Sequence, residues 1–135
     1  MKKFYVGVKG LVRDKNRGFI LLGRDYKSGE KWALPGGRVD GAEDFATTLY
    51  RELTEELPGI TNIIIGELLH VRRLSIDIED NTSLALVYYL VEADLPETIT
   101  LSDEHNGHTF VTGPDDMPEG VHPEVQVLLN RLLTV

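Results

Sequence analysis

The residues most able to do chemistry are three glutamates crowded into the stretch RELTEEL. On a helical wheel at about 100° per residue, Glu52, Glu55 and Glu56 occupy one arc of roughly 100° that borders the apolar face. Arg51 can pair with Glu55 four residues later, yet one arginine cannot neutralise three carboxylates. Because the chain has no cysteine, the oxygen ligands suit a hard cation such as Mg²⁺ or Mn²⁺. The plainer alternative is a solvated acidic helix face.

A longer spacing pattern surrounds these glutamates. Gly37, Glu43, Arg51 and Glu52 stand in the order G-x5-E-x7-R-E-L-x-E-E, which ends at Glu56. Because six residue types are specified, a chance match is on the order of 10⁻⁷ to 10⁻⁸ per starting position. The spacing therefore favours a functional motif over an ordinary surface helix.

The pattern resembles the signature of the Nudix (MutT-like) hydrolases, G-x5-E-x7-R-E-U-x-E-E-x-G-U, in which U is a bulky aliphatic residue. The preceding WALPGG, residues 32 to 37, is a common lead-in to this signature. One departure follows Glu56, where the family expects x-G-U and this sequence reads LPGI, as though one residue were inserted. All the carboxylates precede the departure, so it concerns the exit of the helix.

This resemblance implies an α/β fold, a Nudix-type α/β/α sandwich with a mixed β-sheet, formed by residues 1–135 as a single domain. It also implies a pyrophosphohydrolase that cleaves the diphosphate linkage of a nucleoside diphosphate joined to a group X. By the same resemblance, the metal ligands are three carboxylates and one backbone carbonyl: Glu52, Glu55, Glu56 and Gly37. Arg51 would orient a carboxylate and Glu43 would brace the loop. The general base stays open among the glutamates, with Glu52 and Glu55 as candidates.

The charge of this segment supplies a physical reason for metal binding. Between Gly37 and Gly59 there are six acidic and two basic residues, a net charge of −4. Such a segment would repel a diphosphate, and bound cations reverse that sign. Mg²⁺ or Mn²⁺ would bridge phosphate oxygens, polarise phosphorus and lower the pKa of a bound water.

A second candidate patch is the stretch LSDEHNGHTF. Many Nudix proteins carry S-x-E-H followed, after four residues, by Trp, and Ser102, Glu104 and His105 match with Phe110 at the Trp position. The resemblance makes Glu104 an additional ligand or base, whereas the alternative is an exposed acidic turn. His105 and His108 do not indicate zinc, because further soft ligands are missing.

Arginines are the candidates for contact with phosphate. We expect Arg24 and Arg38 to bind substrate, with Arg72 and Arg73 as further candidates, although each also fits a solvated surface position. Neither GxxxxGK[ST] nor GxGxxG occurs. The sequence therefore supports neither a P-loop nor a dinucleotide-binding Rossmann site.

The substrate is less constrained than the reaction. ADP-ribose hydrolases of the family tend to carry a marker proline downstream of the signature, and this chain has none between Pro58 and Pro96. The preferred substrate is therefore a nucleoside triphosphate, oxidised or not, with ADP-ribose and dinucleoside polyphosphates as alternatives. The alternative from another class is a non-catalytic nucleotide-binding regulator. Such modules usually lose carboxylates of the signature, all of which are present here.

Composition limits the partners and the compartment. The 135 residues carry 14 Lys and Arg against 22 Asp and Glu, and a net charge of −8 argues against a nucleic acid polymer or an anionic membrane as partner. No apolar run approaches the roughly 18 residues that span a bilayer, and Lys9 and Arg13 interrupt the apolar region of a signal peptide. Since cysteine is also absent, we expect the reducing environment of the cytoplasm. We further expect a monomer or homodimer whose partner is a small nucleotide.

The elements that must position these residues alternate between strands and helices. Residues 3–12 and 18–23 are rich in aliphatic and aromatic side chains on either side of RDKNRG, which predicts a hairpin. Residues 33–41, ALPGGRVDG, predict a loop. Further strand patterns, of which the last is apolar on both faces and therefore central, cover residues 62–71, 73–79 and 84–91.

The glutamate helix is expected to begin after Asp44 as N-cap and to end before Pro58 and Gly59. Its expected core face is one arc of the wheel, formed by Phe45, Ala46, Leu49, Tyr50, Leu53 and Leu57. A last helix follows His122 and Pro123, with apolar residues at helical spacing.

Overall fold

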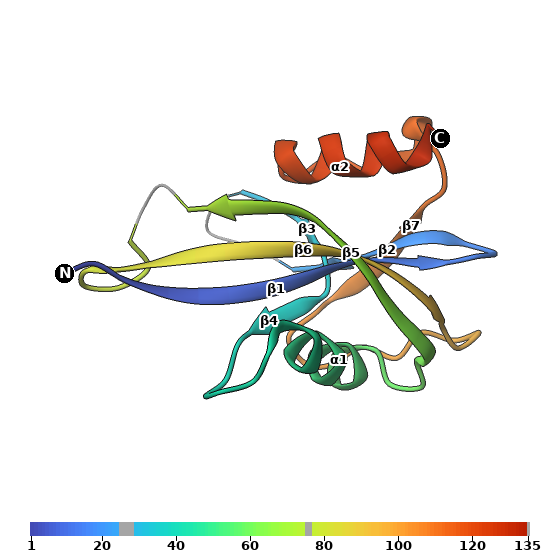
Figure 1. Ribbon diagram of the computed structural model, residues 1–135. Coiled ribbons are helices and arrows are strands. Elements are labelled where there is room, and N and C mark those ends of the chain that lie inside the picture. The colour runs from blue at the N-terminus through green and yellow to red at the C-terminus, as the bar shows by residue number, and fades with distance from the viewer. Residues whose placement is uncertain (25–28, 75–76, 135) are drawn as a thin grey trace.

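One mixed β-sheet lies between two α-helices in the computed structural model, which describes residues 1–24, 29–74 and 77–134 (Figure 1). Within these ranges the strands are β1 (Lys3–Asp14), β2 (Gly18–Gly23), β3 (Trp32–Ala33), β4 (Gly36–Arg38), β5 (Thr61–Arg73), β6 (Thr82–Asp94) and β7 (Gly107–Val111). Helix α1 (Phe45–Glu56) covers one face of the sheet and α2 (Pro123–Leu133), preceded by the 3₁₀ turn η1 (Pro114–Asp116), covers the other. The expected α/β/α sandwich is confirmed.

The sheet is mixed because one of its central pairings is parallel. The strand order is β3-β2-β1-β6-β5, while β4 pairs with β1 and β7 with β2 outside this path. β1 and β6 run parallel, and the other pairs are antiparallel. β6 therefore lies between β1 and β5, which confirms the central strand predicted for residues 84–91.

β1 and β2 form the predicted hairpin. Gly18 has a φ of +95°, a left-handed conformation that glycine adopts without steric cost. Asp14 is buried beside the turn and accepts hydrogen bonds from the backbone N–H of Asn16 at 3.0 Å and of Leu95 at 3.1 Å. This carboxylate ties the turn of the hairpin to the chain that leaves β6.

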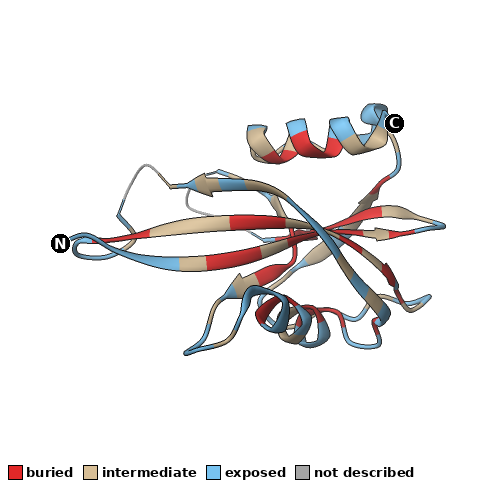
Figure 2. Ribbon diagram, viewed as in Figure 1, coloured by how far each residue is buried: buried red, intermediate tan, exposed pale blue. Residues whose placement is uncertain are grey.

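Two apolar cores lie on opposite faces of the sheet, as the buried segments in Figure 2 show. Leu49 and Leu53 of α1 belong to the first core, and Val125 and Leu129 of α2 belong to the second. Neither helix in the described ranges is long and apolar enough to cross a membrane. Because α1 contributes to one core and α2 to the other, each helix is held to the sheet by its own apolar stripe.

The boundaries of α1 agree with the sequence. The Asp44 side chain accepts a hydrogen bond from the backbone N–H of Thr47 at 2.8 Å, as expected of an N-cap. After the helix, Gly59 has a φ of +90°, and the N–H of Ile60 donates to the carbonyl of Leu57 at 3.0 Å. The extra residue relative to the family signature is thus taken up in this turn, beyond the last glutamate.

The predicted core face of α1 is wrong along one edge. Phe45, Ala46 and Tyr50 are exposed, whereas Thr48 and Glu56 are buried together with the leucines of the helix. The reason is that α1 packs against β4 as well as β1, so the face toward Glu56 turns inward and the opposite edge turns to solvent. A helical wheel uses only the spacing of residues within the helix, so it cannot predict the contact with β4.

Two other predictions need correction. Residues 33–41 are not only a loop, because Gly36–Arg38 forms β4, which pairs antiparallel with β1. Of the strand predicted for residues 73–79, only Arg73 lies in a named strand, while Leu74, Asp77 and Ile78 do not, and residues 75–76 lie outside the described residues. Two of the three residues of β4 are glycines, so this strand lacks the side-chain pattern from which strands are predicted. In the second case, a short turn near Glu79 interrupts the segment with alternating apolar residues.

The corrected face of α1 predicts which residues of this helix stabilise the fold. Leu53→Ala removes a fully buried side chain and should lower the free energy of unfolding by about 2–5 kcal/mol. Tyr50→Ala removes a side chain that is 55% exposed and should change it by about 0.5 kcal/mol or less. Urea unfolding of both variants measures the difference. Equal losses in the two variants would restore the face predicted from the sequence.

Candidate functional site

The site is built where β4 meets α1, at Gly37 and Glu52. A Cβ atom on Gly37 would lie 2.3 Å from Cδ of Glu52 and 2.6 Å from each of its carboxylate oxygens. A Cβ here would displace the Glu52 carboxylate, so glycine allows this carboxylate to lie directly against the strand backbone. β4 is in turn fixed by pairing with β1, where Gly37 is the partner of Val8.

Glu56, one turn further along α1, is the buried carboxyl of the site. It is 5% exposed, and its Oε2 accepts a hydrogen bond from the N–H of Gly36 at 3.4 Å. Burial raises the pKa of Glu56 to about 7, the nearby Lys9 ammonium opposes this rise, and the charges of Glu52 and Glu104 add to it. Burial also raises the pKa of Glu52, against the effect of its arginine neighbour.

Arg51 holds the other carboxylates in place. Its Nε and Nη2 donate to the two oxygens of Glu43 at 3.0 and 2.9 Å, which is a bidentate pair. Its Nη1 donates to Oε1 of Glu52 at 2.9 Å and lies 3.7 Å from Oε2 of Glu55. The hydrogen bonds from Arg51 lower the pKa of Glu43 to about 2. One guanidinium therefore contacts three carboxylates.

Glu43 also closes the loop before α1. Its Oε1 accepts hydrogen bonds from the N–H of Asp40 at 3.2 Å and from Oγ1 of Thr48 at 3.1 Å. The same carboxylate thus joins the loop, the first turn of the helix and Arg51. These contacts are those of a residue that braces the loop.

Lys9 is the residue of this site that sequence reasoning missed. It lies on β1, and its Nζ is 3.4 Å from the carbonyl oxygen of Leu34. Burial lowers the pKa of Lys9, while the charges of Glu56 and Glu52 raise it, so the ammonium is coupled electrostatically to both carboxylates. The signal in the sequence is the position of this lysine, in the middle of the apolar run FYVGVKGLV, where a charged side chain is unusual.

The second sequence patch reaches the same region. Ser102 to His105 form a turn in which the N–H of His105 donates to the carbonyl of Ser102 at 3.1 Å. The charge of Glu104 raises the pKa of both Glu52 and Glu56, so this glutamate adds to the negative potential at the helix carboxylates. Burial lowers the pKa of His105.

The two arginines expected to bind substrate lie in different places. Arg24 follows β2, and its charge lowers the pKa of both Lys9 and His105. The guanidinium of Arg38 stacks over the ring of Tyr5 with its Cζ 4.7 Å from the ring centroid. The charge of Arg24 therefore acts on Lys9, whereas Arg38 stacks on a tyrosine of β1.

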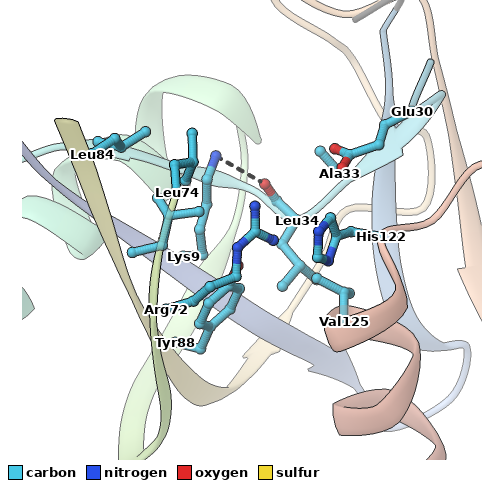
Figure 3. A pocket seen from close by; sticks show the side chains of 11 residues that line it. Lys9, Glu30, Ala33, Leu34, Arg72, Leu74, Leu84, Tyr88, His122 and Val125 are labelled. Carbon is cyan, nitrogen blue, oxygen red and sulfur yellow. Dashed lines mark hydrogen bonds between the residues drawn. The ribbon is translucent and has the colours of Figure 1, made fainter. Parts of the chain in front are cut away.

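A pocket of about 300 Å³ opens beside Lys9, between β1, β6, β5 and the start of α2 (Figure 3). Its walls are apolar and consist of Ala33, Leu34, Leu74, Leu84, Leu86 and Val125. Its polar groups come from Lys9, Glu30, Arg72, Tyr88 and His122. A concave apolar pocket with a few polar groups is typical of a small-molecule site.

The donor chemistry of the carboxylate cluster fits a hard divalent cation. Carboxylate oxygens and the carbonyl of Gly37 are the ligands that Mg²⁺ and Mn²⁺ prefer. Within the described residues, however, no three His, Asp or Glu side chains converge as a finished metal site. Glu52 is paired with Arg51 and Glu56 with the N–H of Gly36, so their side chains would have to reorient to bind an ion.

Comparison with known proteins agrees with the motif. The family model of the NUDIX domain matches residues 3–129 of this chain. An RNA pyrophosphohydrolase of Rhodospirillum rubrum is 33% identical over 58 residues, which is 43% of this chain and 35% of that protein. Nucleoside diphosphate-linked moiety X motif 6 of Xenopus laevis is 42% identical over 52 residues, 38% of this chain and 24% of that protein. The chain thus spans about a third and a quarter of the length of these two curated relatives.

Solved structures share the fold over nearly the whole chain. A MutT NUDIX hydrolase from Burkholderia pseudomallei is 25% identical with a TM-score of 0.74, covering 97% of this chain and 99% of that one. An Ap4A hydrolase from C. elegans is 23% identical with a TM-score of 0.75, covering 96% of each chain.

The raised pKa of Glu56 predicts how stability depends on pH in the absence of metal. Its pKa rises from 4.5 to about 7 on folding, so between these values the native carboxyl keeps a proton that the unfolded chain has lost. The free energy of unfolding should therefore fall as pH rises through this window, by up to about 3 kcal/mol. Glu56→Gln should flatten that fall and be the more stable protein above about pH 7.

Urea unfolding in EDTA at several pH values between about 5 and 8 measures this effect. Glu67→Gln is the matched control, because Glu67 is exposed on β5 and the same change of chemistry there should leave the slope as in the unmodified protein. A Glu56→Gln variant that loses stability with pH as steeply as the control would contradict the assignment.

Proposed function

This chain belongs to the NUDIX family, and from that premise we propose that it is a hydrolase of the diphosphate linkage in nucleoside diphosphate derivatives. The observation that carries the proposal is the junction of Gly37 with Glu52, which holds an acidic helix against a strand with no side chain between them. Buried carboxylates with raised pKa values are uncommon in purely structural positions.

The cation that the cluster would hold is Mg²⁺ or Mn²⁺. Its ligands would be the carbonyl of Gly37 and the carboxylates of Glu52, Glu55 and Glu56. When bound, such an ion polarises a phosphoryl group and lowers the pKa of a water molecule. Arg51 would supply the compensating charge before the ion binds and orient the carboxylates afterwards.

The remaining residues divide between proton transfer and substrate binding. The general base that accepts the proton of the attacking water would be one of three glutamates, Glu52, Glu55 or Glu104. Lys9 and Arg24 would face the phosphates, because their charges act on each other while the guanidinium of Arg51 is already paired with Glu43 and Glu52. The nucleoside would occupy the apolar pocket, which begins at Lys9.

A nucleoside triphosphate is the substrate that fits this arrangement. A pocket of about 300 Å³ is at the small end of ligand sites, which are roughly 300–1,000 Å³, so it fits one nucleoside rather than two. The names of the relatives extend the range to be tested, since they include an RNA pyrophosphohydrolase and an Ap4A hydrolase.

Activity of variants on a nucleotide panel tests the proposal. Nucleoside triphosphates, ADP-ribose, a dinucleoside polyphosphate and 5′-triphosphorylated RNA are incubated with Mg²⁺ or Mn²⁺, and with EDTA. We expect metal-dependent hydrolysis of at least one, reduced by orders of magnitude in Glu56→Gln. Glu104→Gln should lower kcat by about 10² or more and change KM less.

Glu67→Gln should retain full activity in this assay, because Glu67 is exposed on β5. Tight nucleotide binding with no turnover of any member of the panel would instead identify a non-catalytic regulator. Undiminished hydrolysis by Glu56→Gln would remove the helix carboxylates from the mechanism.

A further inference from the structure

The pocket beside Lys9 contains polar groups of opposite charge. Arg72 lies on β5 with a side chain that is only 15% exposed, and its guanidinium points into the pocket (Figure 3). Glu30 reaches the same pocket from the chain that precedes β3. A planar cationic fork and a carboxylate therefore enter one apolar pocket.

Arg72 is held in this position by the first turn of α2. Its Nε lies 3.5 Å from Oε2 of Glu124, and Oε1 of the same carboxylate is 2.9 Å from Nε2 of His70. The hydrogen bond from His70 is the main cause of the lowered pKa of Glu124. Glu124 therefore stays ionised beside the Nε edge of the guanidinium, and the guanidinium extends into the pocket, where it also interacts with Tyr88. This fork is pre-organised for a ligand.

An arginine fork pairs best with two adjacent acceptors in one plane, whereas a carboxylate accepts from two adjacent donors. Guanine offers both, with O6 and N7 as acceptors and N1–H and the 2-amino group as donors on the neighbouring edge. Adenine places an amino group where guanine has O6, so it would set a donor against the guanidinium. The base that complements Arg72 and Glu30 is guanine.

We propose that this pocket binds the guanine base of the substrate, with Arg72 donating to O6 and N7 and Glu30 accepting from N1–H and the 2-amino group. The apolar walls, including Leu34 and Leu86, contact the faces of the base. Lys9 and Glu30 enter the pocket from different sides (Figure 3), so a guanine held by Arg72 and Glu30 would leave its phosphates on the side of Lys9. This inference rests on the proposed function and names the base that it acts on.

The same chemistry distinguishes guanine from its 8-oxo form. Oxidation at C8 places a hydrogen on N7, which turns one of the two acceptors into a donor facing Arg72. A fork that requires both acceptors therefore disfavours the oxidised base. A bidentate pair of this kind contributes about tenfold to a hundredfold discrimination.

Binding of nucleoside monophosphates in EDTA tests the inference without hydrolysis or metal. Calorimetric titration should show GMP binding at least about tenfold more tightly than AMP and than 8-oxo-GMP. Arg72→Gln should weaken GMP binding by about tenfold or more and leave AMP binding within about twofold. Arg131→Gln is the matched control, because Arg131 is exposed on α2 away from the pocket and should leave both affinities unchanged.

Glu30→Gln provides a second variant that does not depend on the packing of Arg72, and it should also weaken GMP more than AMP. Equal binding of GMP and AMP to the unmodified protein, or equal weakening of both by Arg72→Gln, would overturn the inference. Its failure is distinguishable from failure of the proposed function. A pocket with no base preference can still serve a hydrolase, and selective GMP binding can persist where no nucleotide is hydrolysed.

Discussion

The close approach of the Glu52 carboxylate to the backbone of Gly37 is the constraint on which the rest of the site depends. Because a Cβ at Gly37 would lie 2.3 Å from Cδ of Glu52, any other residue there would displace the Glu52 carboxylate from this position. One turn further along α1, Glu56 is buried and accepts a hydrogen bond from the N–H of Gly36. Together these two contacts hold the acidic face of α1 against β4.

Crowding three carboxylates in this way requires positive charge, and the chain supplies it from two directions. Arg51 contacts three glutamates from the same helix and its preceding loop. Lys9 approaches from β1 and also lines the apolar pocket. Since Lys9 belongs to both regions, it joins the acidic cluster, where a cation would act, to the pocket, where a nucleoside would lie. A diphosphate between them would meet positive charge along its length.

The spacing of residues in the sequence was sufficient for the local parts of this site. It predicted the glutamate helix and its Asp44 cap, because both depend on neighbours within one segment. It did not predict that Tyr50 is exposed and Glu56 buried, since that depends on where β4 packs. Nor could it bring Lys9, Arg72 and His122 into one pocket, because their proximity depends on the pairing of β1, β6 and β5 and on the placement of α2.

Mn²⁺ titration of ¹⁵N-labelled protein, followed by paramagnetic broadening of amide signals, tests most directly whether the crowded carboxylates hold a cation. If they do, signals of Gly36, Gly37, Glu56 and Glu104 broaden first, at substoichiometric Mn²⁺, and added Mg²⁺ restores them. Broadening that spreads evenly over other acidic surfaces, such as the segment from Asp115 to Glu119, would contradict this account. In that case the glutamates of α1 would be ordinary surface charge.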